Sequence, residues 1–94
     1  MNKDLIEDRT DTDISNVLGN PHKTILFNDN THSTDEVTIQ IMKAIKCDPM
    51  KASEIMLQAH NTGSAIVITA GLEKCELVAS ILEEIGLATK VETA

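Results

Sequence analysis

The run Phe27-Asn28-Asp29-Asn30 gathers hydrogen-bond acceptors directly after an apolar segment. Taken alone it indicates an ordinary turn, because Asn and Asp side chains bond to nearby backbone N–H groups. Met56 and His60 are four residues apart and would share one face of a helix. Methionine makes an adaptable apolar wall, and Asn, Asp and His offer acceptors. A pocket built from both would suit an ammonium group attached to an apolar side chain, such as a free peptide N-terminus.

A metal centre or an acid–base site finds less support in the residues. His22, His32, His60 and Asp29 can be combined on paper as metal ligands, but their spacing matches no metal motif. Isolated surface histidines are the simpler explanation. The acidic pair Asp35-Glu36 is better explained as the first turn of a helix, where carboxylates suit the helix dipole.

The cysteines and glycines point away from catalysis as well. Cys47 and Cys75 lie 28 residues apart without a Cys-x-x-Cys pattern, and neither has a sequence neighbour that would activate a thiol. We expect buried, reduced thiols. The four glycines fall at turns or helix ends and form no phosphate-binding loop. We therefore expect a protein that is not an enzyme and holds neither a metal nor a cofactor.

Length and charge narrow the classes of partner. The chain has 94 residues, enough for one domain, with eight Lys and Arg against fifteen Asp and Glu and a net charge of −7. An acidic surface is repelled by nucleic-acid phosphates and by anionic membranes. No apolar stretch reaches the roughly eighteen residues of a membrane span, and the first residues lack the apolar core of a signal peptide. We expect neither nucleic acid nor membrane as a partner.

Residues 1–20 differ in composition from the rest. They contain five acidic and two basic residues, and six apolar ones without a sustained helical period. We interpret them as a flexible acidic N-terminal extension that ends in Gly19-Asn20-Pro21, with at most one turn of helix near Ile14–Leu18. Residues 21–94 form the predicted domain.

Local signals indicate the elements that must position the acceptor-rich run. Residues 23–28 are rich in β-branched and aromatic side chains and predict a strand, which a polar loop follows. Ser33 and Glu36 fit a capping box, with each side chain bonding to the other residue's backbone N–H. Apolar residues at helical spacing then predict a helix to about Lys46.

The second half of the domain predicts two more helices and two more strands. Asp48-Pro49 is a helix start, and Gly63 is the expected end of that helix. Residues 64–69 are apolar at consecutive positions, which predicts a central strand. A third helix over 72–85 and a short strand over 87–92 complete the order β-α-α-β-α-β. The fold class is α+β, a single small domain with a three-stranded sheet packed against helices.

Two segments resemble the ClpS family of adaptors for ATP-dependent Clp proteases. Leu26-Phe27-Asn28-Asp29-Asn30 is similar to the family's L-x-N-D-D-x-T-P-M-E motif at the start of its first helix. The segment Ile55–Ala65 is similar to its M-L-x-x-H-x-x-G-x-A motif, and the match runs without a gap from Asn28 to His60. The resemblance covers residues 21–92, and the family also has a disordered N-terminal extension.

The resemblance implies a function and a set of contacts. ClpS-type adaptors bind proteins by a hydrophobic N-terminal residue, an N-degron, and deliver them to a Clp/Hsp100 AAA+ unfoldase and its peptidase. The implied groups around the α-ammonium are Asn28, Asp29, Asn30 and His60. The implied hydrophobic pocket consists of Thr34, Val37, Met56, Ala59 and Leu87. The implied contacts with the N-terminal domain of the unfoldase are Glu73 and Val78.

Four of these positions depart from the family pattern. Asn30 replaces a second loop acid, and Thr34 replaces a methionine that narrows the mouth of the pocket. Ala59 stands where larger aliphatic residues are common, and Val78 stands where the family has a lysine. We expect a wider and less apolar pocket than is usual in the family.

Two functions stay open on the sequence alone. The first is a divergent N-degron adaptor, which the retained Asn28, Asp29 and His60 favour. The alternative is a ClpS-like interaction module that has lost N-degron recognition and binds a partner through its surface. The C-terminal domain of the ribosomal stalk protein has the same topology and binds translation factors, so the fold does not decide between them.

The same resemblance bears on the role of the N-terminal extension and on where the protein works. The extension is either a solvated acidic leader or a segment that threads toward the unfoldase pore. We expect a monomer that works in the cytoplasm or in the stroma of an organelle of bacterial origin.

Overall fold

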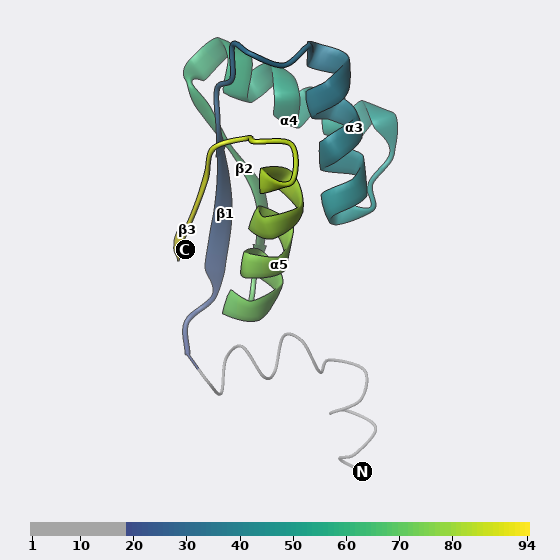
Figure 1. The fold of residues 1–94 in the computed structure, drawn as a ribbon. Coiled ribbons are helices and arrows are strands. Elements are labelled where there is room, and N and C mark those ends of the chain that lie inside the picture. The colour runs from purple at the N-terminus through teal and green to yellow at the C-terminus, as the bar shows by residue number, and fades with distance from the viewer. Residues whose placement is uncertain (1–18) are drawn as a thin grey trace.

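Three strands and three helices make up the described part of the chain, residues 19–94 of a computed structural model (Figure 1). Their order is β1 (His22–Phe27), α3 (Thr34–Ile45), α4 (Pro49–Thr62), β2 (Ser64–Ala70), α5 (Leu72–Glu83) and β3 (Thr89–Thr93). This order confirms the predicted α+β fold. Apart from Gly19 and Asn20, the predicted extension of residues 1–20, with the helical turn expected near Ile14–Leu18, lies outside the described residues.

The sheet is antiparallel with the strand order β2-β1-β3, so β1 is the central strand. Our expectation that β2 is central was wrong, because its apolar side chains face in two directions. Ala65 and Val67 are buried, whereas Ile66 is 49% exposed. On β1, Ile25 pairs with Ile66 on one side and with Lys90 on the other. The end of β1, from which the loop of residues 28–33 departs, is therefore held by both neighbouring strands.

The predicted capping box at the start of α3 is confirmed. The Glu36 N–H donates to Ser33 Oγ at 3.1 Å, and the Ser33 N–H donates to Glu36 Oε1 at 2.8 Å. These bonds satisfy two backbone donors that a helix N-terminus otherwise leaves without a partner. They also fix the point at which the loop of residues 28–33 ends.

The start and the end of α4 follow the predicted signals. The Asp48 side chain accepts a hydrogen bond from the Lys51 N–H at 2.8 Å, and Pro49 occupies the first turn. Gly63 ends the helix at φ 99°, in the left-handed region that glycine adopts without steric cost. The rotation of α4 about its axis, and with it the direction of its side chains, is set at both ends by local sequence.

The helices cover one face of the sheet, and α5 contacts all three strands (Figure 1). Two buried polar groups join the layers: Thr24 Oγ1 donates to the Cys75 carbonyl at 2.8 Å, and Gln40 Nε2 donates to the Ile81 carbonyl at 2.6 Å. A buried polar group left without its partner costs about 1–3 kcal/mol, so these bonds hold α5 against β1 and α3. The core between them is aliphatic and consists of Leu26, Val37, Ile41, Ala44, Ala52, Ile55, Ala59, Ala65, Val67, Val78, Leu82 and Leu87.

The connection between α5 and β3 is longer than predicted. The helix ends at Glu83, and the strand begins at Thr89. The Gly86 N–H donates to the Glu83 carbonyl at 2.9 Å, which closes the helix with a tight turn. Leu87 follows this turn and enters the core with 2% of its surface exposed, so it is a packed loop residue and not part of the strand.

Candidate functional site

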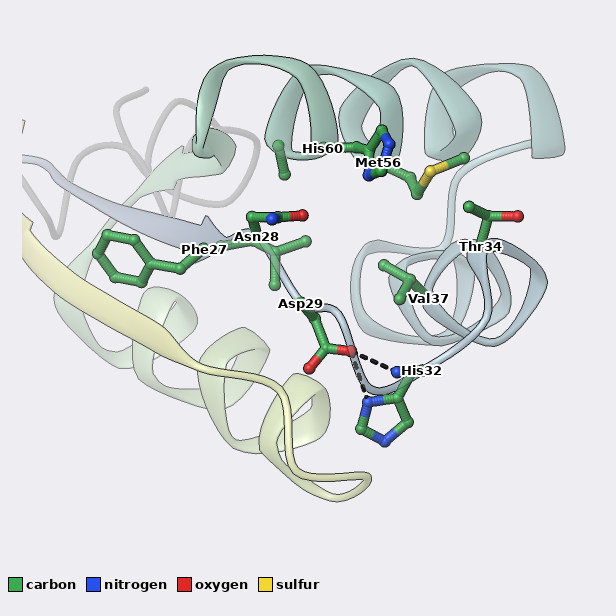
Figure 2. Close-up of a pocket in the computed structure, with 10 residues that line it drawn as sticks. Phe27, Asn28, Asp29, His32, Thr34, Val37, Met56 and His60 are labelled. Carbon is green, nitrogen blue, oxygen red and sulfur yellow. Dashed lines mark hydrogen bonds and ion pairs between the residues drawn. The ribbon is translucent and has the colours of Figure 1, made fainter.

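A small hollow, called the pocket below, lies where β1, the loop of residues 28–33, α3 and α4 meet (Figure 2). The centre of a water molecule can occupy about 20 Å³ of it. Its lining combines apolar side chains with hydrogen-bonding groups and consists of Leu26, Phe27, Asn28, Asp29, His32, Thr34, Val37, Met56, Ala59 and His60. Of the residues predicted around the ammonium and in the hydrophobic pocket, Asn30 and Leu87 are the ones that do not line it.

One wall of the pocket comes from α4. Met56, Ala59 and His60 share a face of this helix because they are three and four residues apart. Ala59 is 3% exposed and lies at the inner end, Met56 is half-buried, and His60 is exposed to solvent. The wall therefore changes from apolar at its inner end to hydrogen-bonding at its outer end.

The first turns of α3 supply the facing wall. Val37 is 7% exposed, and its side chain lies across the pocket from Met56 in Figure 2. Thr34, the first residue of α3, is exposed at the outer edge. The gap between Val37 and Met56 suits an apolar side chain, whereas the hydroxyl of Thr34 makes the outer edge polar.

Asn28 lies at the end of β1, on the same side of the pocket as His60 in Figure 2. Its backbone N–H donates to the Gly63 carbonyl at 2.9 Å, which ties it to the end of α4. Its side-chain Nδ2 donates to Asn30 Oδ1 at 3.3 Å. With that nitrogen engaged, the amide oxygen of Asn28 is the atom that can accept from a ligand. Asn30 thus acts on Asn28 and has no place in the lining.

The Asp29 carboxylate is turned toward His32 and away from His60 (Figure 2). Its Oδ2 accepts from the backbone N–H of Thr31 at 3.0 Å, from the backbone N–H of His32 at 2.6 Å and from His32 Nδ1 at 2.9 Å. The two backbone donors make an Asx turn, and the imidazole adds a third donor to the same oxygen. Of the four residues predicted around the ammonium, Asn28, Asp29 and His60 line the pocket, and Asp29 is the one whose carboxylate is already engaged by His32.

The hydrogen bonds at Asp29 shift the titration of both partners. The backbone N–H of His32 holds the pKa of the Asp29 carboxyl below its ordinary value; partial burial opposes this, and the His32 ring and the Thr31 N–H reinforce it. The hydrogen bond to Asp29 raises the pKa of His32, again against partial burial and with smaller contributions from the Ile85 backbone and Glu36. Each partner thus favours the charged form of the other.

Two predicted contact residues lie inside the protein instead. Leu87 is 2% exposed and belongs to the core, because the turn after α5 directs it inward. Val78 is completely buried, since it follows Cys75 by three residues on the inner face of α5. Its predicted contact with an unfoldase was therefore wrong. Glu73, in the first turn of α5, is exposed as a partner contact requires.

His32 is a lining residue to which the sequence pattern gave no role beyond a metal ligand on paper. The available signal was an aspartate three residues before a histidine in a polar loop, because an Asx turn brings the following residues' donors to one carboxylate. Leu26 and Phe27 also line the pocket without having been predicted. The Phe27 ring points away from Val37 in Figure 2.

The part of the chain that the structure describes contains no cluster of three His, Cys, Asp or Glu side chains that could hold a metal ion. Cys47 and Cys75 are both free thiols, and Cys75 is buried. No helix within residues 19–94 is long and apolar enough to cross a membrane.

Comparison with known proteins gives one family. The family described as "ATP-dependent Clp protease adaptor protein ClpS" matches residues 19–90. The ClpS adapter protein of Gloeobacter violaceus is 39% identical over 72 residues, which are 76% of this chain and 77% of the relative. That of Prochlorococcus marinus is 32% identical over 72 residues, 76% of this chain and 69% of the relative.

A solved structure has the same fold. Agrobacterium tumefaciens ClpS2, bound to L-phenylalaninamide, superposes with a TM-score of 0.75 at 22% identity, over 80% of this chain and 98% of that one. The two motifs around Asn28 and His60, the fold and the relatives agree, and the chain belongs to the ClpS family of Clp protease adaptor proteins.

Proposed function

We propose that this protein is an adaptor that binds other proteins by a free, hydrophobic N-terminal residue and delivers them to a Clp/Hsp100 unfoldase with its peptidase. The observation that carries the proposal is that the exposed Asn28 and His60 line the same pocket as Val37 and Met56. Acceptors beside an apolar gap match an ammonium group beside an apolar side chain. The phenylalanine amide held by the Agrobacterium relative has that chemistry.

Each group at the outer end has a separate task. The amide oxygen of Asn28 and a neutral His60 ring nitrogen accept hydrogen bonds from the ammonium, and bonds of this charge-assisted kind contribute about 1.5–3 kcal/mol each. Asp29 lines the pocket with its Oδ2 engaged by Thr31 and His32, and it adds negative charge at the rim. Acetylation of the peptide N-terminus removes the ammonium charge and one or more donors, and abolishes binding.

The walls of the pocket select a bulky apolar first residue. Ala59 at the inner end and Thr34 at the outer edge are both small, so Val37 and Met56 determine the width of the gap. The open volume of about 20 Å³ is small for a large side chain. Met56 has three rotatable bonds and is half-buried, so its movement supplies the remaining space.

The exposed surface of α5 is the proposed contact for the unfoldase. Glu73 is the predicted residue that remains available there after Val78 is excluded. We further propose that the protein acts as a monomer, in the cytoplasm or an organelle stroma of bacterial origin, and that its charge of −7 keeps it from nucleic acids. In this scheme residues 1–20 thread toward the unfoldase pore, so their deletion stops delivery and leaves peptide binding intact.

One observation favours a second candidate, a ClpS-like module that has lost N-degron recognition and acts through its surface. Asp29 is turned toward His32, and Asn30 replaces the second loop acid, so the rim offers less negative charge to an ammonium than the family motif does. In that case binding to an unfoldase persists while binding to N-terminal residues is absent.

A fluorescence-anisotropy titration separates the two candidates. The peptides differ at residue one (Leu, Phe, Trp, Ile, Arg or Gly), and each is also made with an acetylated N-terminus. The adaptor predicts a Kd of about 1 μM or tighter, near −8 kcal/mol, for bulky apolar residues and no binding of the acetylated forms. Equal binding of free and acetylated peptides contradicts ammonium recognition. No binding of any peptide favours the surface module.

A further inference from the structure

His32 occupies a place in the pocket to which the proposed function assigns no task. It provides two of the three donors to Asp29 Oδ2, one from its backbone and one from its ring. We propose that His32 is a positioning residue that holds the Asp29 carboxylate at the bend of the loop and, when protonated, cancels the negative charge that this carboxylate offers to a ligand ammonium. The proposal rests on the proposed function and extends it to the regulation of affinity by pH.

The geometry of the pair supports a fixed position for Asp29. The His32 backbone N–H and ring Nδ1 lie 2.6 and 2.9 Å from one carboxylate oxygen. The two side chains are 19% and 15% exposed for His32 and Asp29, so the pair is largely shielded from solvent. A hydrogen bond in such surroundings competes less with water than one at an open surface. Without the ring, Asp29 keeps its two backbone donors and loses the third, so its carboxylate is held less firmly.

The imidazole also lies beside the turn after α5. A Cβ atom placed on Gly86 would lie 3.8 Å from His32 Cε1, which is ordinary van der Waals contact. The Ile85 backbone adds to the upward shift of the His32 pKa. A neutral imidazole has one N–H and a protonated imidazole has two. Protonation therefore gives the ring a second donor while it keeps its bond to Asp29.

The charges that face His32 determine the direction of the pH effect. Among the described residues these are Asp29 in the same loop and Glu36 in the first turn of α3, and the turn after α5 contributes the Ile85 backbone dipole. With a neutral ring, Asp29 keeps its full negative charge near the pocket. With a protonated ring, the pair has no net charge and attracts an ammonium less. Affinity for a free N-terminus therefore rises as the pH rises through the pKa of His32.

Two substitutions separate the positioning of Asp29 from its charge compensation. His32→Asn keeps a donor near the position of Nδ1 and does not titrate, whereas His32→Ala removes both the donor and the charge. The assay is anisotropy with a Leu-initiated peptide and its acetylated form, at about pH 8 and about pH 5.5, on either side of an ordinary histidine pKa. Matched controls are His22→Asn and His22→Ala, at the opposite end of β1 from the pocket.

The expected pattern has two parts. At about pH 8, His32→Asn binds within about twofold of the natural protein and His32→Ala about fivefold more weakly, the loss expected for one net hydrogen bond. At about pH 5.5, His32→Asn binds about threefold more tightly than the natural protein, the size of a Coulomb interaction across several ångströms of water. Because His60 is the same in all the proteins, the ratio of affinities between variants at one pH isolates the effect of His32. The His22 variants follow the natural protein at both pH values.

A carboxyl NMR titration adds a readout that needs no peptide. The pKa of Asp29 is expected to rise part of the way toward its ordinary value in His32→Ala, which keeps the backbone donor of residue 32, and to rise less in His32→Asn. Equal affinities of the two variants at about pH 8 overturn the positioning role, and parallel pH profiles of the natural protein and His32→Asn overturn the charge compensation. In either case peptide binding itself still supports the proposed function. If the natural protein binds no free-amine peptide at either pH, the proposed function fails, and this inference fails with it.

Discussion

Replacing Asn28 by alanine removes one of the two acceptors that the pocket offers to a ligand ammonium. A hydrogen bond to a charged group contributes about 1.5–3 kcal/mol, and the exposure of Asn28 and His60 places the loss at the lower end of that range. About 1.5 kcal/mol corresponds to about a tenfold rise in Kd. The backbone N–H of residue 28 keeps its bond to Gly63, 2.9 Å long, so the fold is expected to be retained.

The matched control is Asn30→Ala, which removes the same amide from the same exposed loop outside the pocket. Asn30→Ala removes the hydrogen bond of 3.3 Å that orients the Asn28 amide, but the amide oxygen of Asn28 remains as an acceptor. The Kd is therefore expected to change by no more than about twofold. Both variants are titrated by anisotropy with a free and an acetylated Leu-initiated peptide. Urea unfolding is expected to agree with the natural protein within about 0.5 kcal/mol, as is usual for exposed positions.

A double-mutant cycle with His60→Ala tests whether the two acceptors serve one ammonium. Groups that bind the same charge are expected to couple by about 0.5 kcal/mol or more, so the double variant loses less than the sum of the single losses. The reasoning is refuted if Asn28→Ala binds the free peptide as tightly as the natural protein, or if Asn30→Ala loses as much as Asn28→Ala. Strict additivity would show that Asn28 and His60 act on separate parts of the ligand.

Three further predictions concern pH, selectivity and stability. The Asp29–His32 pair stabilises the fold most between about pH 3.8 and 6.5. Because the pKa of Asp29 is lowered, its contribution to stability is lost as the pH falls through that pKa. Because the pKa of His32 is raised, its contribution to stability is lost as the pH rises through that pKa. Urea unfolding of the natural protein and His32→Asn at pH values inside, below and above this range tests it, and a stability difference that is the same at all of them contradicts it. Thr34→Met narrows the outer edge of the pocket and is expected to lower the affinity for a Trp-initiated peptide relative to a Leu-initiated one in the same anisotropy assay. An unchanged ratio of the two affinities would show that residue 34 does not contact the ligand. Val78→Ala leaves a void at a completely buried position and is expected to cost about 2 kcal/mol in urea unfolding, without changing peptide affinity.

The helices were predictable because their signals are local. The Ser33–Glu36 capping box, the Asp48-Pro49 start and the Gly63 end each involve residues within one turn of one another, and each is present in the structure. The strand order was not predictable in the same way. An apolar run such as residues 64–70 is compatible with a central strand or with an edge strand that has one buried face, and the pairing of β1 with both neighbours is decided by contacts distant in sequence.

The candidate site was predictable to the level of which elements contribute, but not to the level of which way each side chain points. The spacing of Met56 and His60 placed them on one wall, as found. The orientation of Asp29 depends on whether its oxygens bind His32 or a ligand. Composition and residue spacing do not tell which of these partners is preferred. At Val78 the apolar stripe of the third helix already indicated burial, and the alignment with a family lysine led to the wrong assignment.

The loop that lines the pocket is tied to the rest of the protein at both of its ends. The Phe27 N–H bonds to the Ala88 carbonyl at 3.0 Å, the Asn28 N–H bonds to the Gly63 carbonyl at 2.9 Å, and Ser33 is fixed by its capping box. A binding surface held in this way is preorganised, so an incoming chain end loses its own freedom but orders little of the receptor. Association then needs no slow rearrangement of the loop. Differences in affinity between N-terminal residues should therefore appear in how long each stays bound and not in how fast it arrives.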